Sequence, residues 1–111
     1  MKNEQIFTEQ IENLIAQGEE NRNVFVEMFD DQIQKIKDRL NSLDETRDMA
    51  EKQYQTEELP LGFYNIIVKK LDNTEKELED LLKEVIDKRN EVVIEYNNLI
   101  AKANRLKVVM M

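Results

Sequence analysis

The chain has 111 residues, of which 36% are charged and 6% aromatic, and it contains two glycines, one proline, no cysteine and no histidine. This composition is typical of long amphipathic helices, and a chain of this length forms one domain with a modest core. The missing cysteine and histidine exclude disulfides, thiolate metal sites and the commonest general base.

The net charge of −8 lies in residues 1–60, which hold 15 acidic and 7 basic residues, whereas residues 61–111 hold 9 of each. Sequence-independent binding of nucleic acid requires an excess of basic side chains. We therefore expect no direct contact with nucleic acid.

The first predicted helix covers residues 3–17, where apolar residues recur at the spacing of one helical face: Ile6, Phe7, Ile11, Leu14 and Ile15. Gly18 follows, and glycine is favoured just past the end of a helix. Asn21 or Asn23 can cap the next helix. A short helix and a bend are therefore predicted.

A second helix is predicted over residues 21–58. Its inward positions recur in alternating steps of four and three: Phe29, Ile33, Ile36, Leu40, Leu43, Arg47, Ala50 and Tyr54. Pro60 disfavours helix at the residue before it, and Gly62 relaxes the backbone. The turn is accordingly predicted at residues 59–62.

A third helix is predicted over residues 63–109, with a seven-residue apolar repeat: Tyr64, Leu71, Leu78, Val85, Val92, Leu99 and Leu106. The two long patterns can be paired so that facing residue numbers add to 121, as for Phe29 with Val92 and Ala50 with Leu71. Half of this sum falls between Pro60 and Leu61, which agrees with the predicted turn.

Further apolar residues widen the third helix far from the turn, at Ile86, Val93 and Ile100. On the second helix the same level carries Val24, Phe25 and Met28. The first helix would cover these two sets by folding back at Gly18. The predicted fold is therefore all-α, a single domain of residues 1–111: a long antiparallel helical hairpin with a short N-terminal helix packed on its terminal end, making a three-helix bundle.

Three charged residues fall on the inward stripes: Arg47, Lys88 and Arg89. Their stems can pack between the helices while the charged ends reach neighbouring acids. Alternatively they fix the helix register or contact an acidic partner.

Two apolar groups are candidate partner-binding sites. One lies around the turn and comprises Tyr54, Phe63, Tyr64 and Ile67, which either close the hairpin or form an apolar tip. The other ends the chain and comprises Val108, Val109, Met110 and Met111, which either continue the helix or form a hook that inserts into a partner.

No catalytic site, cofactor or metal site is expected. Ser42 is the only serine and has no histidine to activate it, and no phosphate-binding glycine loop or calcium-loop spacing is present. Adjacent acids such as Asp30-Asp31 are expected on solvated faces. No stretch approaches the ~20 apolar residues of a membrane span. With a start unlike a signal peptide, a cytoplasmic protein is expected, with secretion by a leaderless route as the alternative.

Two helices joined by a short turn that contains Gly62 resemble the small helical partners of type VII secretion, whose turn carries Trp-x-Gly. This turn reads Leu-Pro-Leu-Gly-Phe, and the chain has no tryptophan. The tyrosine-x-x-x-acid signal of that family matches Tyr54 to Glu58, whereas the family carries it at the C-terminus. The chain also resembles export chaperones of flagella and injectisomes, and small phage assembly or inhibitor proteins.

We therefore expect a non-enzymatic protein-interaction module, that is, an adaptor, secretion partner, chaperone or assembly subunit that presents helix faces to another protein. A second copy of the chain is also a candidate partner, because two helices alone leave their apolar stripe partly uncovered. The alternative is an acidic, phage-type inhibitor or nucleic-acid mimic that occupies a basic site on another protein.

Overall fold

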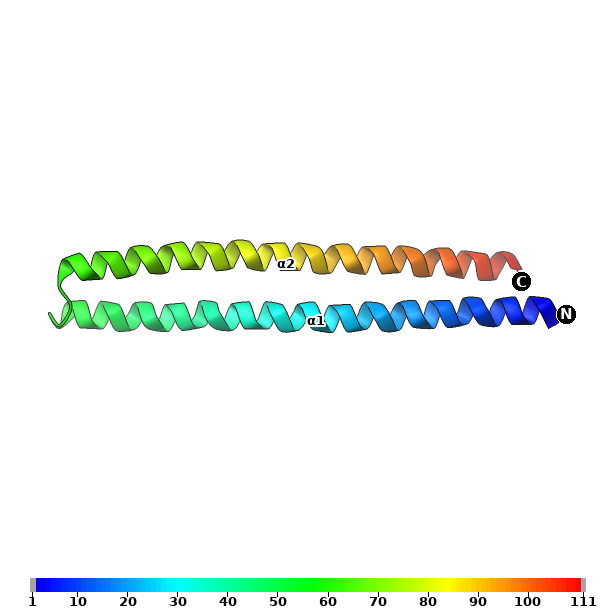
Figure 1. Cartoon of the computed structure of the whole chain (residues 1–111), viewed down its shortest axis with the longest axis horizontal. Coiled ribbons are helices and arrows are strands. Elements are labelled where there is room, and N and C mark those ends of the chain that lie inside the picture. The colour runs from blue at the N-terminus through cyan, green and yellow to red at the C-terminus, as the bar shows by residue number, and fades with distance from the viewer. Residues whose placement is uncertain (1, 111) are drawn as a thin grey trace. The chain divides into compact units, whose positions relative to one another are not determined.

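The computed structural model describes residues 2–110, with the side chains of residues 3–109, and contains two helices joined by one turn (Figure 1). Helix α1 spans Lys2–Gln55 and helix α2 spans Leu61–Met110. The chain divides into two compact parts. We call Asp31–Ile86 the turn unit, and the chain up to Asp30 together with the chain from Asp87 onward the terminal unit.

The prediction of an all-helical hairpin is confirmed, but the prediction of a three-helix bundle is wrong. The segments predicted as separate helices over residues 3–17 and 21–58 form the single helix α1. No separate N-terminal helix folds back, so the apolar residues it was expected to cover keep an open side.

Gly18 explains the error, because it serves packing and not helix termination. It is buried inside α1, and its φ is not positive. A Cβ placed on it would lie 3.3 Å from Cγ1 of Ile100 in α2. The missing side chain thus leaves room for Ile100. Glycine often ends a helix, but at this position it allows two helices to approach each other.

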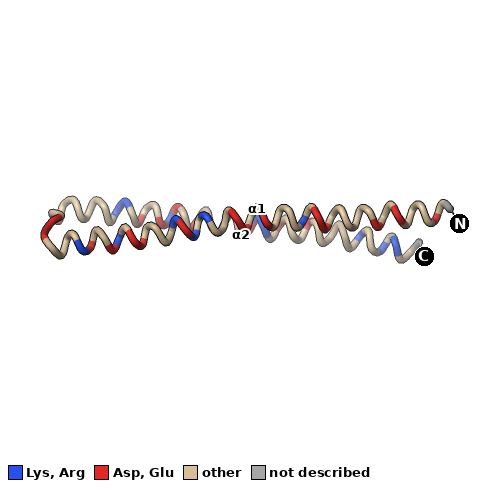
Figure 2. Tube along the Cα trace, turned by 90° about the horizontal axis from the view of Figure 1, so that it is seen from below, with Lys and Arg blue, Asp and Glu red and all other residues tan. Residues whose placement is uncertain are grey.

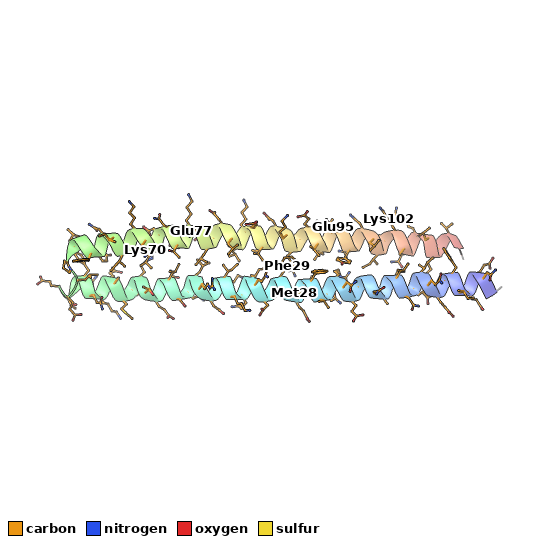
Figure 3. The ribbon with its side chains drawn as sticks, viewed as in Figure 1. Met28, Phe29, Lys70, Glu77, Glu95 and Lys102 are labelled. Carbon is orange, nitrogen blue, oxygen red and sulfur yellow. The ribbon has the colours of Figure 1, made fainter. Side chains whose placement is uncertain are left out.

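In the terminal unit the inward residues of α1 and α2 form a continuous set, which we call the seam. They are buried or half-buried and lie three or four residues apart: Ile11, Ile15, Gly18, Arg22, Val26 and Phe29 on α1, and Arg89, Val92, Tyr96, Ile100, Ala103 and Lys107 on α2. Figure 3 places Phe29 between the two helices and Met28 on α1. This spacing is that of an antiparallel coiled coil.

In the turn unit the seam continues with the same spacing. Its residues are Ile33, Ile36, Leu40, Leu43, Arg47, Ala50 and Tyr54 on α1, and Tyr64, Val68, Leu71, Glu75, Leu78, Leu82 and Val85 on α2. The rings of Tyr54 and Tyr64 stack at its turn end with centroids 4.5 Å apart.

Two cross-helix contacts correct the predicted register by three residues, whereas the Phe25–Tyr96 ring pair, with centroids 5.9 Å apart, joins residues of neighbouring layers. Gly18 meets Ile100 in the terminal unit and Tyr54 meets Tyr64 in the turn unit, and the numbers in each pair add to 118. The same sum pairs all the seam residues given above within each unit. The inward residues of each helix alternate between two positions of the seven-residue repeat. The predicted sum of 121 paired the same position on both helices. In the structure, each layer, that is, each pair of facing seam residues, has the first position on one helix and the second position on the other.

Two helices bury little apolar surface. Among the described side chains, only Ile11, Ile36, Ala50 and Leu71 are buried hydrophobic residues, whereas 17 large hydrophobic side chains are exposed. Exposed apolar patches on a soluble protein mark surfaces that meet other molecules. The fold therefore directs attention to its uncovered faces.

The turn lies at residues 56–60, somewhat before the predicted 59–62. Glu57 has a positive φ of 61°. The N–H of Glu57 donates to the carbonyl of Tyr54, and the N–H of Glu58 donates to the carbonyl of Gln53. This is the Schellman arrangement that ends helices, with glutamate at the position that favours glycine.

Pro60 directly precedes α2 and does not interrupt a helix. Its carbonyl accepts the N–H of Tyr64 as the first bond of the helix, so proline, which has no N–H to lose, stands at the helix N-terminus. Gly62 lies within α2 without a positive φ, so the predicted role of Gly62 in the turn is wrong.

Replacing Glu57 by glycine should stabilise the protein. The left-handed conformation costs a residue with a Cβ about 1–2 kcal/mol, and glycine loses part of this gain through its freedom in the unfolded chain. We expect the free energy of unfolding to rise by about 0.5–1 kcal/mol, measured by urea denaturation at fixed chain concentration. Glu58→Gly removes the same charge without relieving a positive φ, and it should lower the free energy of unfolding. Equal effects of the two substitutions would contradict this role of Glu57.

Candidate protein-binding surfaces

Basic residues of the terminal-unit seam reach across to the opposite helix, and we call these contacts clamps. Arg89 Nε donates to Asp30 Oδ1 at 2.7 Å, and Lys107 Nζ lies 3.0 Å from Glu12 Oε1. A third clamp joins Arg22 Nη1 to Asn97 Oδ1 at 2.8 Å. In every clamp, the basic side chain reaches the residue that comes next in the sequence after its facing seam residue. Arg89, for example, faces Phe29 and reaches Asp30.

The turn unit has one clamp of the same kind. Arg47 donates to Asp72 Oδ1 and to Glu75 Oε2, both at 2.6 Å. The hydrogen bond to Asp72 raises the pKa of Arg47, with the charges of Asp72, Glu75 and Asp44 adding to the effect and burial opposing it. Arg47 therefore stays charged throughout the pH range of a folded protein.

Of the three charged residues singled out from the sequence, Arg47 and Arg89 lie on the seam. Lys88 lies outside it, 61% exposed, and pairs at 3.4 Å with Glu91 on the same helix. Arg22 and Lys107 were not singled out although they occupy the same kind of position. Both follow a seam residue by four, and extending the α1 spacing through Gly18 would have revealed Arg22.

The four residues predicted at the turn separate into a supported pair and an exposed side. Tyr54 and Tyr64 stack on each other, and Ile67 is half-buried. Phe63 is 63% exposed. Two exposed neighbours were not predicted from the sequence: Leu61, which is 56% exposed, and Ile66, which is 66% exposed. Ile66 stands three residues after Phe63, a spacing that places both on one side of α2. We call Leu61, Phe63 and Ile66 the tip.

Of the apolar residues at the end of the chain, Val108 and Val109 lie within α2. Val108 and Val109 are 72% and 80% exposed, and the helix runs to Met110. The Met110 side chain and the whole of Met111 lie outside the described residues. The two valines continue the helix, and their side chains are not covered by α1. They can therefore still contact a partner.

The terminal unit has two unlike flanks beside the seam. On α1, the residues directly after seam residues form the clamp flank: Glu12, Ala16, Glu19, Asn23, Glu27 and Asp30. The residues directly before seam residues are all uncharged: Gln10, Leu14, Gln17, Asn21, Phe25 and Met28. Figure 2 shows acidic residues along this part of α1 and basic residues near the C-terminal end of α2.

The uncharged flank borders a groove between the helices. Leu14 lines this groove together with residues of α2: Leu99, Ile100, Lys102, Ala103 and Leu106. Leu14, Leu99 and Leu106 are each more than half exposed. We call this side of the terminal unit the open face, comprising the six uncharged α1 residues and the α2 residues that directly precede seam residues: Lys88, Glu91, Glu95, Leu99, Lys102 and Leu106.

Within the described residues, no group of three or more acidic, histidine or cysteine side chains is arranged to hold a metal ion. No helix in that range is long and apolar enough to cross a membrane.

Removing the Arg47 clamp should destabilise the protein. Arg47→Ala loses two charge-assisted hydrogen bonds and the packing of its stem, and we expect the free energy of unfolding to fall by about 1–2 kcal/mol in urea denaturation. Lys35 is the matched control: its 3.0 Å pair with Asp31 is within one helix and 72% exposed on the lysine side. Lys35→Ala should change stability by less than about 0.5 kcal/mol. Equal losses would mean that the clamp contributes no more than a surface pair.

No family model matches this sequence, and no curated protein and no solved structure matches it either.

Proposed function

We propose that this chain is a non-enzymatic protein-interaction module that binds a partner protein through its tip. The observation that carries the proposal is the exposure of Leu61, Phe63 and Ile66 on the first two turns of α2. Burying an isoleucine or phenylalanine side chain contributes about 1.5–3 kcal/mol, so Phe63 and Ile66, which share one side of α2, together supply a substantial part of a binding energy.

The surroundings of the tip support this use. The stacked rings of Tyr54 and Tyr64 hold α1 and α2 together beside it, so the apolar side chains project from a fixed base. A preorganised surface loses less entropy on binding than a mobile one. The partner we infer is a protein with an apolar groove that accepts the first turns of a helix.

The module fits several processes, among them adaptor, secretion partner, chaperone and assembly subunit. These share the same physical act, which is the presentation of a helix surface to another chain. The tip supports that shared act.

A second candidate function is an acidic inhibitor that occupies a basic site on another protein. It is favoured by the acidic residues on the clamp flank of α1, such as Glu19 and Glu27. Binding of this kind should weaken strongly between low and high salt, whereas binding through the apolar tip should persist.

The test is photo-crosslinking in cells of the source organism, with benzoylphenylalanine at Phe63 or Ile66. We expect one protein to be crosslinked from both positions, and its adduct to survive high salt. Leu81 is the matched control, since it is 42% exposed on the same helix but about 22 Å along it from Ile66. An absent adduct, the same adducts from Leu81, or an adduct only with a second copy of this chain would contradict the proposal.

A further inference from the structure

The open face of the terminal unit is not covered by this chain. All three clamps of the terminal unit reach the opposite flank, where they bring charges across the seam. No cross-helix ion pair lies on the open face within the described residues, and its α1 side carries no charge at all. An uncharged stripe six positions long is unusual in a chain that is 36% charged, which indicates that this side binds another molecule.

The α2 side of the open face is complementary to itself. Leu99 lies between Glu95 and Lys102, which are labelled in Figure 3. The midpoint of Glu95 and Lys102 falls between residues 98 and 99. If a second α2 lay antiparallel across this midpoint, each Glu95 would stand level with the Lys102 of the other copy, and the two Leu99 side chains would meet.

The α1 side has the same kind of symmetry. Gln17 and Asn21 have their midpoint at residue 19, and so do Gln10 and Met28. Leu14 and Phe25 have theirs between residues 19 and 20. An antiparallel copy centred there would set amide against amide and leucine against phenylalanine.

These two centres coincide in space. Seam residues of one layer have numbers that add to 118, as for Gly18 and Ile100, so residue 99 of α2 lies level with residue 19 of α1. The two midpoints therefore agree within about one residue, or ~1.5 Å along the helix. A single two-fold axis can serve both helices of the face.

We propose that the open face binds a second copy of this chain, antiparallel about a two-fold axis at the level of residues 19 and 99. In this dimer α1 crosses over its own counterpart and α2 over its own, so the two terminal units form a four-helix bundle. The charge pattern selects this arrangement. A copy turned about the long axis would set α2 over α1, and Glu95 and Lys102 would face the uncharged stripe without partners.

One further charged pair lies at the edge of this dimer. Leu106 would stand level with Glu91 of the other copy, and Glu91 pairs with Lys88 on its own helix at 3.4 Å. The carboxylate is thus already paired, and its aliphatic stem is available to pack beside the leucine.

The first experiment measures molar mass by light scattering and the dissociation constant by sedimentation. We expect the native 13.2 kDa chain to form a dimer. Lys102→Glu alone, or Glu95→Lys alone, creates two repulsive pairs per dimer and should weaken association at least about tenfold. The double exchange Glu95→Lys with Lys102→Glu should restore it. Arg105→Glu makes the same charge change on the outer side of α2 and should leave association unchanged.

A second experiment keeps the proposal testable if a charge variant loses helix content in circular dichroism. The chain has no cysteine, so a single Leu99→Cys would stand beside its counterpart at the two-fold axis and should form a disulfide-linked dimer on mild oxidation. Ile94→Cys, similarly exposed on another side of α2, should not.

Several results would overturn the proposal. A native chain that is monomeric in solution would do so, as would a dimer that Arg105→Glu weakens as much as Lys102→Glu. Failure of the double exchange to restore association, with helix content intact, would exclude the antiparallel placement. Equal formation of disulfide-linked dimers by Ile94→Cys and Leu99→Cys would mean that the disulfides form in random collisions and not at an interface. None of these results bears on the tip, so the dimer and the proposed function fail separately.

Discussion

Gly18 and Ile100 occupy one layer of the seam, and the space above the glycine is filled by the isoleucine side chain, 3.3 Å from where a Cβ would lie. This contact requires α1 to remain helical through Gly18, because only a continuous helix presents Ile11, Ile15 and Gly18 in succession to α2. It also fixes the level of each residue on one helix against the other in the terminal unit. The identity of every cross-helix partner follows from that alignment.

The alignment gives the terminal unit two different sides. Each seam cation reaches the residue after the one it faces, and these residues all fall on the same flank of the helix pair. The cross-helix polar contacts therefore concentrate there, and on the other flank the α1 side consists of leucine, phenylalanine, methionine and amides. A two-helix structure thereby separates the contacts that fix its own register from the surface on which another chain can pack.

The turn unit illustrates a different balance. Its single clamp at Arg47 fixes the register, and the tyrosine stack closes the end. The turn itself holds Glu57 in a conformation suited to glycine, which costs stability. Beside it, Leu61, Phe63 and Ile66 remain exposed, and the proposed partner-binding function relies on these three side chains.

Much of this fold could be predicted from the sequence. The alternating spacing from Phe29 to Tyr54 identified the α1 seam in advance, and Pro60 identified the region of the turn. Two features could not be read from the pattern. A glycine at a helix end and a glycine at a close approach look alike until the partner is known, so Gly18 was interpreted as a cap. Its neighbours in the seam, Arg22 and Val26, follow in two successive steps of four and interrupt the heptad alternation.

The surfaces were predicted less completely, for a related reason. Phe63 was recognised as a candidate because aromatic residues stand out, whereas Ile66 and Leu14 resemble ordinary core residues in a sequence. Whether such a residue faces the seam or lies beside it depends on the register, and periodicity alone left the register uncertain by about one helical turn. The open face became visible only when the sum of 118 placed Leu14 before a seam residue.

The most direct measurement of that alignment is a pair of engineered cysteines, since the chain has none of its own. With Gly18→Cys and Ile100→Cys together, the two Cβ atoms should lie within disulfide range, and mild oxidation should close an intramolecular bond seen as a mobility change on a non-reducing gel. Gly18→Cys with Ala103→Cys, whose numbers add to 121, should remain reduced. Efficient closure of the second pair and not the first would contradict the register on which the seam, the clamps and the open face all depend.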